Sequence, residues 1–371
     1  MNTALSRADG PRFVRYCALG AMHFETLQPE HLPLLQDWLR RDYARFWGMG
    51  HMSLTQLADY VDEIQRSSHR DIALGLWNGE PAFLFEGYHP AHDRLAGRVA
   101  RDPLLRDCGF QLLREVAAIG YRNPYYEQAL PASSPYRKML SALWRESPLG
   151  HIEPGQRLMT MAALLHSDGD ERALLPTLIS ASGLTADRWL RLYLNAYLRP
   201  LLHCFYAHDL VFMPHGENLI LVLEDHLPVR VLMKDIGEEA VILDGEAQIP
   251  EAVGRLAVSV PDELKVLSIF TDVFDGFFRY LGQILDEQVG LPEQRFWQQV
   301  ADCIADYQAR QPQLRDKFAR YDLFAEEFAR SCLNRLQLGN NRQMLDLADP
   351  AGALKFAGTL KNPVAPYAPE R

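Results

Sequence analysis

The segment Pro214–Asp235 decides the fold, and it reads PHGENLILVLEDHLPVRVLMKD. Its two apolar runs predict β-strands at Leu219–Glu224 and Val229–Lys234, joined by the four-residue loop 225–228. Ala240–Leu243 predicts a third short strand, and the three strands together would form an antiparallel meander. Beyond Pro261 the apolar residues recur at helical spacing, so we expect helices to follow the sheet.

Polar residues flank the first two strands of this meander. If the loop closes a regular hairpin, Glu224 faces Val229, and Asn218 then lies opposite Asp235. The register therefore brings five polar side chains to one end of the sheet: His215, Glu217, Asn218, Lys234 and Asp235. Two carboxylates and an amide oxygen suit a hard cation such as Mg²⁺, and a lysine with a histidine suits a phosphate. The alternative is an ordinary polar strand end with a turn.

Composition limits the classes of protein to which the chain can belong. Its 371 residues are enough for two or three domains, and 48% apolar with 23% charged residues is typical of globular proteins. The net charge of −10 argues against a general binder of nucleic acid or anionic membranes. No apolar run approaches the ~20 residues of a membrane-spanning helix, and no secretory signal is visible at the N-terminus. The five cysteines lack CxxC spacing, which favours a reduced, cytoplasmic protein without structural zinc.

Residues up to about Gly97 predict the order helix, helix, strand, turn, strand. The first helix is expected at His31–Arg45, and Ser53-Leu-Thr-Gln56 resembles a capping box that begins the second. Strands are expected at Ile72–Trp77 and Pro81–Tyr88, because Asn78-Gly79 between them is a strong hairpin turn.

The middle of the chain is predicted to be helical. A long helix capped by Thr185 should be kinked or ended by Pro200. His203 and His208 follow that proline at i, i+5 spacing, which places them poorly on one helical face for a metal, so we interpret them as ordinary helix-end residues. The other expected helices cover Leu104–Ile119, Tyr136–Trp144, Gln156–His166 and Ala173–Ser182, and the tail Asn362–Arg371 is expected to be loose.

Several motifs resemble the C-terminal half of the NRPS-independent siderophore synthetases, the aerobactin-synthetase-like ligases. They are the PHGEN segment with its strands, Arg122-Asn123-Pro124, the run KMLSALWRESP at 138–148 and NRLQLGNN at 334–341. The resemblance covers about residues 98–365. It implies ATP-dependent activation of a carboxylate as an acyl adenylate, followed by capture by an amine or hydroxylamine.

The resemblance also implies roles for individual residues. The family's ATP–Mg²⁺ site matches His215, Glu217, Asn218 and Asp235, and the Glu217 position is often Gln there. Glu217, Asn218 and Asp235 would hold Mg²⁺. His215 and Lys234 would contact phosphate or adenylate, and Arg145 would help to fix an anion. Apart from the resemblance, Arg335, Asn340 and Asn341 on the late helices are candidates to bind the substrate carboxylate, and a solvated helix end is the alternative interpretation.

The first region resembles a different family, the GNAT acyltransferases that acylate N-hydroxylated amines in siderophore pathways. The matching stretches are ARFWGM at 44–49 and GLWNGEPAFLFEGYHPAHD at 75–93. By resemblance, His89 and Asp93 are candidate general bases, with Glu86 as a further polar site residue. Trp38, Trp47 and Trp77 are interpreted as core or acyl-pocket residues. The order of the two regions resembles the bifunctional desferrioxamine synthetases.

The sequence departs from both families. No Gly-rich loop for the CoA pyrophosphate follows Asp93, apart from a partial match in Arg106–Gln111, and the synthetase's Ser-x-Arg-Thr motif is missing. We interpret the junction near Leu95–Asp102 as an internal deletion. A Walker A loop and a Gly-x-Ser-x-Gly elbow are also absent from the sequence.

These observations predict an α+β protein with a partial GNAT-like region (1–97), a synthetase palm-and-thumb region (98–365) and a loose tail (366–371). The first functional hypothesis is an ATP- and Mg²⁺-dependent amide-forming ligase acting on hydroxamate precursors such as N-succinyl-N-hydroxycadaverine. The alternatives are a catalytically weak remnant that binds nucleotide or a partner subunit, and a CoA-dependent N-acyltransferase. The expected partners are small molecules rather than nucleic acid or membrane, and the family resemblance implies a homodimer.

Overall fold

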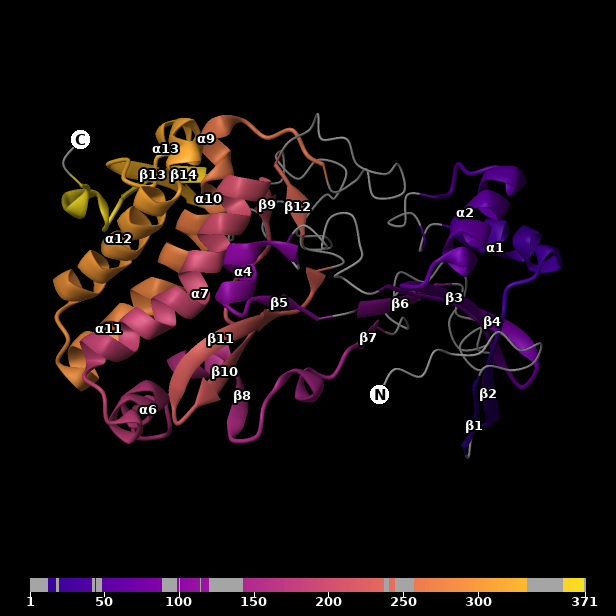
Figure 1. Cartoon of the computed structure of the whole chain (residues 1–371), viewed down its shortest axis with the longest axis horizontal. Helices are drawn as coiled ribbons and strands as arrows, with labels where there is room; N and C mark the ends of the chain where they lie inside the picture. The colour runs from indigo at the N-terminus through magenta and orange to yellow at the C-terminus, as the bar shows by residue number, and fades with distance from the viewer. Residues whose placement is uncertain are drawn as a thin grey trace. The chain divides into compact units, whose positions relative to one another are not determined.

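The computed structural model describes residues 13–17, 20–41, 44, 49–88, 99, 101–113, 115–119, 143–236, 240–243, 257–331 and 356–369. The chain forms two compact units, and each draws on separate stretches of the sequence (Figure 1). The first unit contains residues 1–97, 114–146 and 249–255, and the second contains residues 98–113, 147–248 and 256–371. Within the described ranges, no helix has both the length and the apolar composition needed to cross a lipid bilayer.

The first unit contains a six-stranded antiparallel sheet with the order β1-β2-β3-β4-β6-β7. Two helices, α1 and α2, pack on one face of this sheet, where Trp38, Leu57 and Ile64 meet Ile72 and Leu74 of β3. The elements are β1 (Phe13–Cys17), β2 (Gly20–Glu25), α1 (Leu32–Leu39), α2 (Leu54–Arg66), β3 (Arg70–Trp77), β4 (Glu80–Tyr88), β6 (Glu115–Ile119) and β7 (Leu143–Arg145), with a 3₁₀ turn η1 (Pro29–His31) before α1.

Local sequence signals in this unit are confirmed. The capping box at α2 is present, because the Ser53 hydroxyl accepts from the Gln56 amide (3.2 Å) and the Gln56 side chain accepts from the Ser53 amide (2.8 Å). The hairpin β3–β4 turns at Asn78-Gly79, where both residues have positive φ. Strands β1 and β2, which precede the helices, were not predicted.

The second unit is built around the four-stranded sheet β5-β11-β10-β8 and the 23-residue helix α7, which packs on β11 (Figure 1). The strands are β5 (Gln111–Leu112), β8 (Gln156–Thr160), β9 (Leu210–Val211), β10 (Leu219–Glu224), β11 (Leu227–Met233), β12 (Val241–Ile242), β13 (Glu327–Ser331) and β14 (Phe356–Lys361). The helices are α4 (Pro103–Asp107), α6 (Leu174–Ser182), α7 (Ala186–His208), α9 (Asp262–Lys265), α10 (Leu267–Ile269), α11 (Arg279–Val289), α12 (Glu293–Arg310) and α13 (Arg315–Arg320).

Shorter helical segments complete the second unit. A π-helical segment, η8 (Phe270–Phe278), joins α10 to α11 and carries five buried apolar residues. The 3₁₀ turns are η5 (Pro148–His151), η6 (Met161–Leu165), η9 (Pro312–Leu314) and η10 (Ala365–Tyr367). These elements place the loop that precedes β10 beside η6 and α7.

Several predicted elements of the middle region are wrong. The helix expected at Leu104–Ile119 ends at Asp107 and is followed by strands β5 and β6, and the one expected at Gln156–His166 is strand β8 followed by η6. The third meander strand, β12, pairs with β9 instead of β11. In each case the pairing partner is distant in sequence, so local periodicity favoured the wrong element. The helix expected at Tyr136–Trp144 lies mostly outside the described residues, and its end belongs to β7.

Two further expectations are corrected, namely an end of the long helix at Pro200 and a loose start of the tail. Helix α7 continues through Pro200 to His208, where the left-handed Asp209 caps it. Pro200 is buried in a helix with an extensive apolar face, and this packing outweighs the ~3 kcal/mol that an interior proline costs. The tail is not loose at its start, because the buried Asn362 side chain donates to the carbonyls of Leu323 (2.8 Å) and Ala325 (2.7 Å).

Candidate functional site

The PHGEN loop (Pro214–Asn218) is held by hydrogen bonds to its backbone carbonyls. The Tyr197 hydroxyl of α7 donates to the Pro214 carbonyl at 2.7 Å. The Gly216 carbonyl accepts from the Ala162 amide at 2.9 Å and from the Thr160 hydroxyl at 3.2 Å. Three separate elements, α7, η6 and β8, therefore fix the loop in position before β10 begins.

Gly216 allows the loop to approach η6 closely. A Cβ atom at this position would lie 2.8 Å from Cα of Ala162, 2.9 Å from its backbone nitrogen and 2.8 Å from the Phe277 ring. Two of these contacts are with backbone, which cannot move aside as a flexible side chain can. The position thus requires glycine for the close backbone approach that the sequence indicated.

The hairpin that follows has a different register from the predicted one. Asp225 and His226 both have positive φ (49° and 66°) and form a two-residue turn, so Glu224 faces Leu227 rather than Val229. A bulge between Val222 and Leu223 then shifts the pairing by one residue.

The shifted register changes which polar residues face each other. Leu219 pairs with Met233, and the Lys234 amide donates to the Asn218 carbonyl at 3.0 Å. The predicted pairing of Asn218 with Asp235 is therefore wrong by one residue. Asp235 follows Lys234 in the left-handed region (φ 58°), and the Lys234 ammonium bonds its carboxylate at 2.8 Å.

His215, Glu217, Lys234 and Asp235 nevertheless form one electrostatic cluster. Burial lowers the pKa of His215, the nearby Lys234 ammonium lowers it further, and the Glu217 and Asp235 carboxylates only partly offset this. The imidazole is therefore neutral near pH 7. Glu217 is exposed, whereas the other three side chains are half-buried.

The hydrogen bonds of Asn218 fix the tautomer of His215. Asn218 is buried, and its amide nitrogen donates to the Met213 carbonyl at 3.1 Å and contacts Nε2 of His215 at 3.3 Å. An amide nitrogen can only donate, so Nε2 must accept and the imidazole proton lies on Nδ1. His215 thus offers a neutral N–H donor at Nδ1.

The donor types of this cluster fit a cation bound to an anionic ligand. The carboxylates of Glu217 and Asp235 and the amide oxygen of Asn218 are the hard oxygen ligands that Mg²⁺ prefers. Lys234 is the cationic donor next to them, although its ion pair with Asp235 means that a cation at this carboxylate would compete with the ammonium.

The remaining predicted site residues belong to the first unit or lie outside the described residues. Arg145 lies at the end of β7 in the first unit. His89, Asp93, Arg335, Asn340 and Asn341 lie outside the described residues. Glu86 is described: its carboxylate accepts from the Tyr60 hydroxyl at 2.8 Å and pairs with Arg70 at 3.2 Å.

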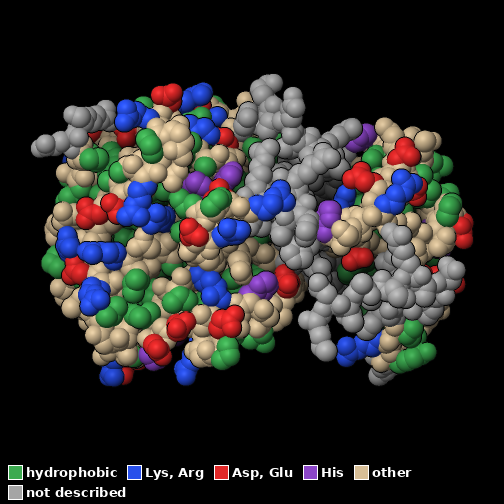
Figure 2. Space-filling view, viewed as in Figure 1, with side chains coloured by type: hydrophobic (Ala, Val, Ile, Leu, Met, Phe, Trp, Pro, Cys, Tyr) green, Lys and Arg blue, Asp and Glu red, His purple; other side chains and the backbone are tan. Residues whose placement is uncertain are grey.

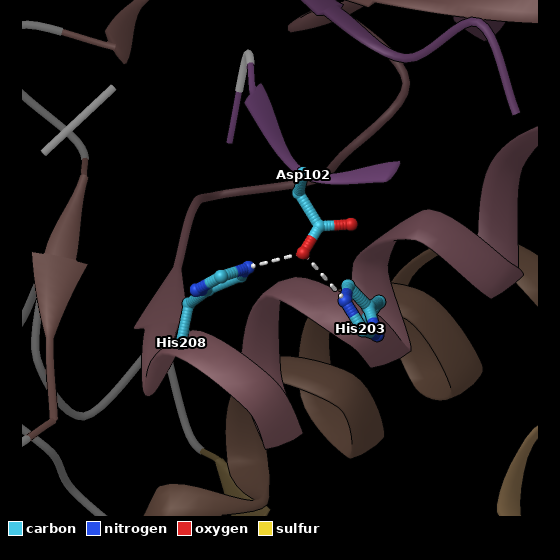
Figure 3. Close-up of side chains that lie close together, drawn as sticks. All are labelled: Asp102, His203 and His208. Atoms are coloured by element: carbon cyan, nitrogen blue, oxygen red, sulfur yellow. Dashed lines mark hydrogen bonds and ion pairs between the residues drawn. The ribbon is translucent and has the colours of Figure 1, made fainter. Parts of the chain in front are cut away.

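The structure also reveals a cluster that the sequence analysis missed. Asp102, His203 and His208 point toward one another near the C-terminal end of α7 (Figure 3). In the sequence analysis, His203 and His208 were treated as a pair, without Asp102. One local signal marks Asp102: it precedes Pro103, and an aspartate before a proline is typical of the N-cap of a helix. Elsewhere on the face of the second unit seen in Figure 2, acidic and basic side chains are interspersed.

Comparisons with known proteins identify relatives of both regions. Residues 187–346 match the family model "Ferric iron reductase FhuF-like transporter", and residues 28–133 match the acetyltransferase (GNAT) domain. Putrebactin synthase of Shewanella sp. is 58% identical over 273 residues, which are 74% of this chain and 43% of that protein. Over this stretch the chain is therefore similar to a siderophore synthase, as its motifs predicted.

Two further proteins are similar to the chain in sequence or in fold. The rhizobactin siderophore biosynthesis protein RhbF of Rhizobium meliloti is 32% identical over 72% of this chain and 45% of its own length. The petrobactin biosynthesis protein AsbB of Bacillus anthracis has a TM-score of 0.60 at 17% identity, covering 90% of this chain and 63% of that chain. This confirms the expected α+β synthetase fold. The chain spans less than half the length of the two sequence relatives.

The acetyltransferase match bears on the extent of the GNAT-like region. It runs to residue 133, past the expected boundary at 97, and strands β6 and β7 extend the sheet of β1–β4. The boundaries at residues 97 and 365, like the internal deletion, stay predictions.

Proposed function

We propose that this chain takes part in siderophore biosynthesis as an ATP-dependent, amide-forming ligase. In the proposed reaction, a substrate carboxylate attacks the α-phosphate of ATP and releases pyrophosphate, and an amine then attacks the acyl adenylate and releases AMP. The substrate class is hydroxamate precursors such as N-succinyl-N-hydroxycadaverine. The observation that carries the proposal is the 58% identity to putrebactin synthase over 273 residues.

The PHGEN cluster supplies groups suited to the first step. Glu217, Asn218 and Asp235 would hold Mg²⁺, which neutralises phosphate charge when bound. Lys234 would donate to a phosphate oxygen, and the neutral His215 would donate from Nδ1 rather than act as a cation. Arg145 would bind an anion, and Arg335, Asn340 and Asn341 would bind the substrate carboxylate. A cytoplasmic location, small-molecule partners and a homodimer belong to the same proposal.

Calorimetric titration of MgATP into the purified chain tests the proposal, with Asp235→Ala as the variant. We expect micromolar binding that the variant loses, followed by AMP release in a ligase assay with hydroxamate substrates. Glu224→Ala is the matched control, because Glu224 is an exposed carboxylate at the opposite end of β10. Folded protein without binding would favour the alternative of a catalytically weak remnant.

A second candidate function is acyl transfer from acyl-CoA to an N-hydroxylated amine. The GNAT match at 28–133 and the six-stranded sheet of the first unit favour it. His89 and Asp93 are its candidate bases. Release of free CoA from succinyl-CoA on addition of N-hydroxycadaverine would support this activity, and an unchanged rate in His89→Ala and Asp93→Ala would contradict those roles.

A further inference from the structure

Asp102, His203 and His208 form a compact cluster in the second unit, formed by α4 and α7 (Figure 3). Asp102 is the N-cap of α4, and its Oδ1 accepts from the Leu105 amide at 3.1 Å. Its Oδ2 lies 3.0 Å from Nε2 of His203 and 3.1 Å from Nε2 of His208. One carboxylate oxygen and two imidazole nitrogens thus converge from positions about a hundred residues apart in sequence.

The cluster is largely shielded from solvent, and a residue outside it orients one of its histidines. The side chains of Asp102, His203 and His208 are 13%, 7% and 17% exposed. His203 bonds through its other nitrogen, Nδ1, to the Tyr307 hydroxyl of α12 at 3.0 Å. A histidine that ligates a metal typically has such a partner on its second nitrogen, which orients the ring.

We propose that Asp102, His203 and His208 bind one divalent transition-metal ion, with Zn²⁺ as the best match. Two imidazoles and one carboxylate form a ligand set that suits Zn²⁺ and its neighbours rather than Mg²⁺ or Ca²⁺. Bond lengths of about 2.0–2.1 Å in tetrahedral geometry put ligand atoms about 3.3 Å apart. The observed separations of 3.0 and 3.1 Å from Oδ2 are close to that value, and all three ligand atoms lie within 4.8 Å of one another.

Proton positions are compatible with this site. Binding requires Nε2 of both histidines to be unprotonated, so each ring carries its proton on Nδ1. In His203 that proton would be donated to the Tyr307 hydroxyl, which is already within hydrogen-bond distance. The competing interpretation is a purely hydrogen-bonded cluster, in which both Nε2 atoms donate to Oδ2 of Asp102.

The bound ion would join two segments that are distant in sequence. His208 is the last residue of α7 and precedes His215 of the PHGEN loop by seven residues. Asp102 begins α4 on the segment that leads into β5. The ion would therefore stabilise the end of α7 against the start of α4, and this inference does not depend on the proposed ligase activity.

Titration of the chelator-treated chain with Co²⁺ tests the site directly, because tetrahedral Co²⁺ absorbs in the visible range. We expect one equivalent to bind with a visible band, Zn²⁺ to displace it, and Zn²⁺ to raise the melting temperature. His208→Gln and Asp102→Asn should weaken binding at least 100-fold. His166→Gln removes an exposed histidine outside the cluster and should leave binding unchanged.

A second variant separates a metal site from a structural cluster. Tyr307→Phe keeps the ring but removes the partner of His203, and loss of such a partner typically lowers metal affinity 10–100-fold. Circular dichroism spectra confirm which variants are folded. The proposal is overturned if the folded wild-type chain binds no Co²⁺ or Zn²⁺, or if folded Tyr307→Phe and His208→Gln bind them as tightly as the wild type.

Discussion

At the scale of single residues, the contact between Gly216 and Ala162 determines how the PHGEN loop sits on η6. Substituting Gly216→Ala should force the two backbones apart, because the added Cβ would lie 2.8 Å from Cα of Ala162. Overpacking of this kind typically costs about 1–3 kcal/mol. We expect a lower free energy of unfolding in urea and weaker MgATP binding. Gly169→Ala is the control, since no atom lies within 4 Å of its added Cβ, and equal losses in both variants would contradict the role of close approach.

Glu86 gives a pH-dependent prediction. Burial raises the pKa of Glu86, although hydrogen bonds from Tyr60 and the charge of Arg70 oppose the shift. A carboxyl group whose pKa is higher in the folded state contributes stability below its unfolded pKa and loses it as pH rises through the folded value. We therefore expect the stability of the wild type relative to Glu86→Gln to fall as the pH rises above the ordinary range of a glutamate carboxyl group.

Urea unfolding at several pH values measures this difference. Glu63→Gln is the control, because Glu63 also pairs with Arg70 but is 73% exposed. A difference between wild type and Glu86→Gln that is independent of pH would show that burial of Glu86 does not shift its ionisation on folding.

The residues of the PHGEN cluster were predictable because they are close to a hairpin, whereas their exact pairing was not. A two-residue turn and a bulge replaced the four-residue loop, and together they moved the register by one position. Strand register depends on such local irregularities, which the apolar pattern does not encode. His203 and His208 were interpreted separately from Asp102 for a related reason: the third residue comes from α4, far away in sequence.

At the scale of elements, the capping box at the N-terminus of α2 was predicted correctly, and its contribution to stability can be tested. Ser53→Ala removes the hydroxyl that accepts from the Gln56 amide, and loss of an N-cap typically costs about 1 kcal/mol. We expect the free energy of unfolding to fall by about that amount in urea titration. Thr55→Ala, on the same exposed turn, keeps the capping box and should be close to neutral. A neutral Ser53→Ala would contradict a stabilising cap.

Elements without such end signals were harder to predict. Residues Gln156–Thr160 form a strand because they pair with residues 220–224 of β10, which come at least sixty positions later in the chain. Pro200 has the local signature of a helix end, yet α7 continues because both sides of the proline pack into the core. Tertiary burial decided both cases, and a single sequence read locally contains no measure of it.

At the scale of the whole molecule, the two units are interleaved along the chain. The first unit takes residues 114–146 and 249–255 from within the region that the motifs assigned to the synthetase. Motif-based boundaries follow sequence order, whereas compact units follow strand pairing, here of β6 with β4. The sequence therefore indicated both kinds of region correctly but could not show how the chain passes between them.

This arrangement predicts that MgATP and succinyl-CoA bind to different stretches of the chain. Hydrogen–deuterium exchange with MgATP should slow exchange in peptides covering residues 210–236, because the PHGEN loop and the end of β11 carry the candidate ligands, and Asp235→Ala should abolish the effect. Exchange in residues 54–88 should be unaffected. Succinyl-CoA should do the reverse if the GNAT-like sheet binds it. MgATP protection confined to residues 54–88 would contradict the assignment of the nucleotide to the PHGEN cluster, since slowed exchange reports where opening of the backbone becomes less favourable.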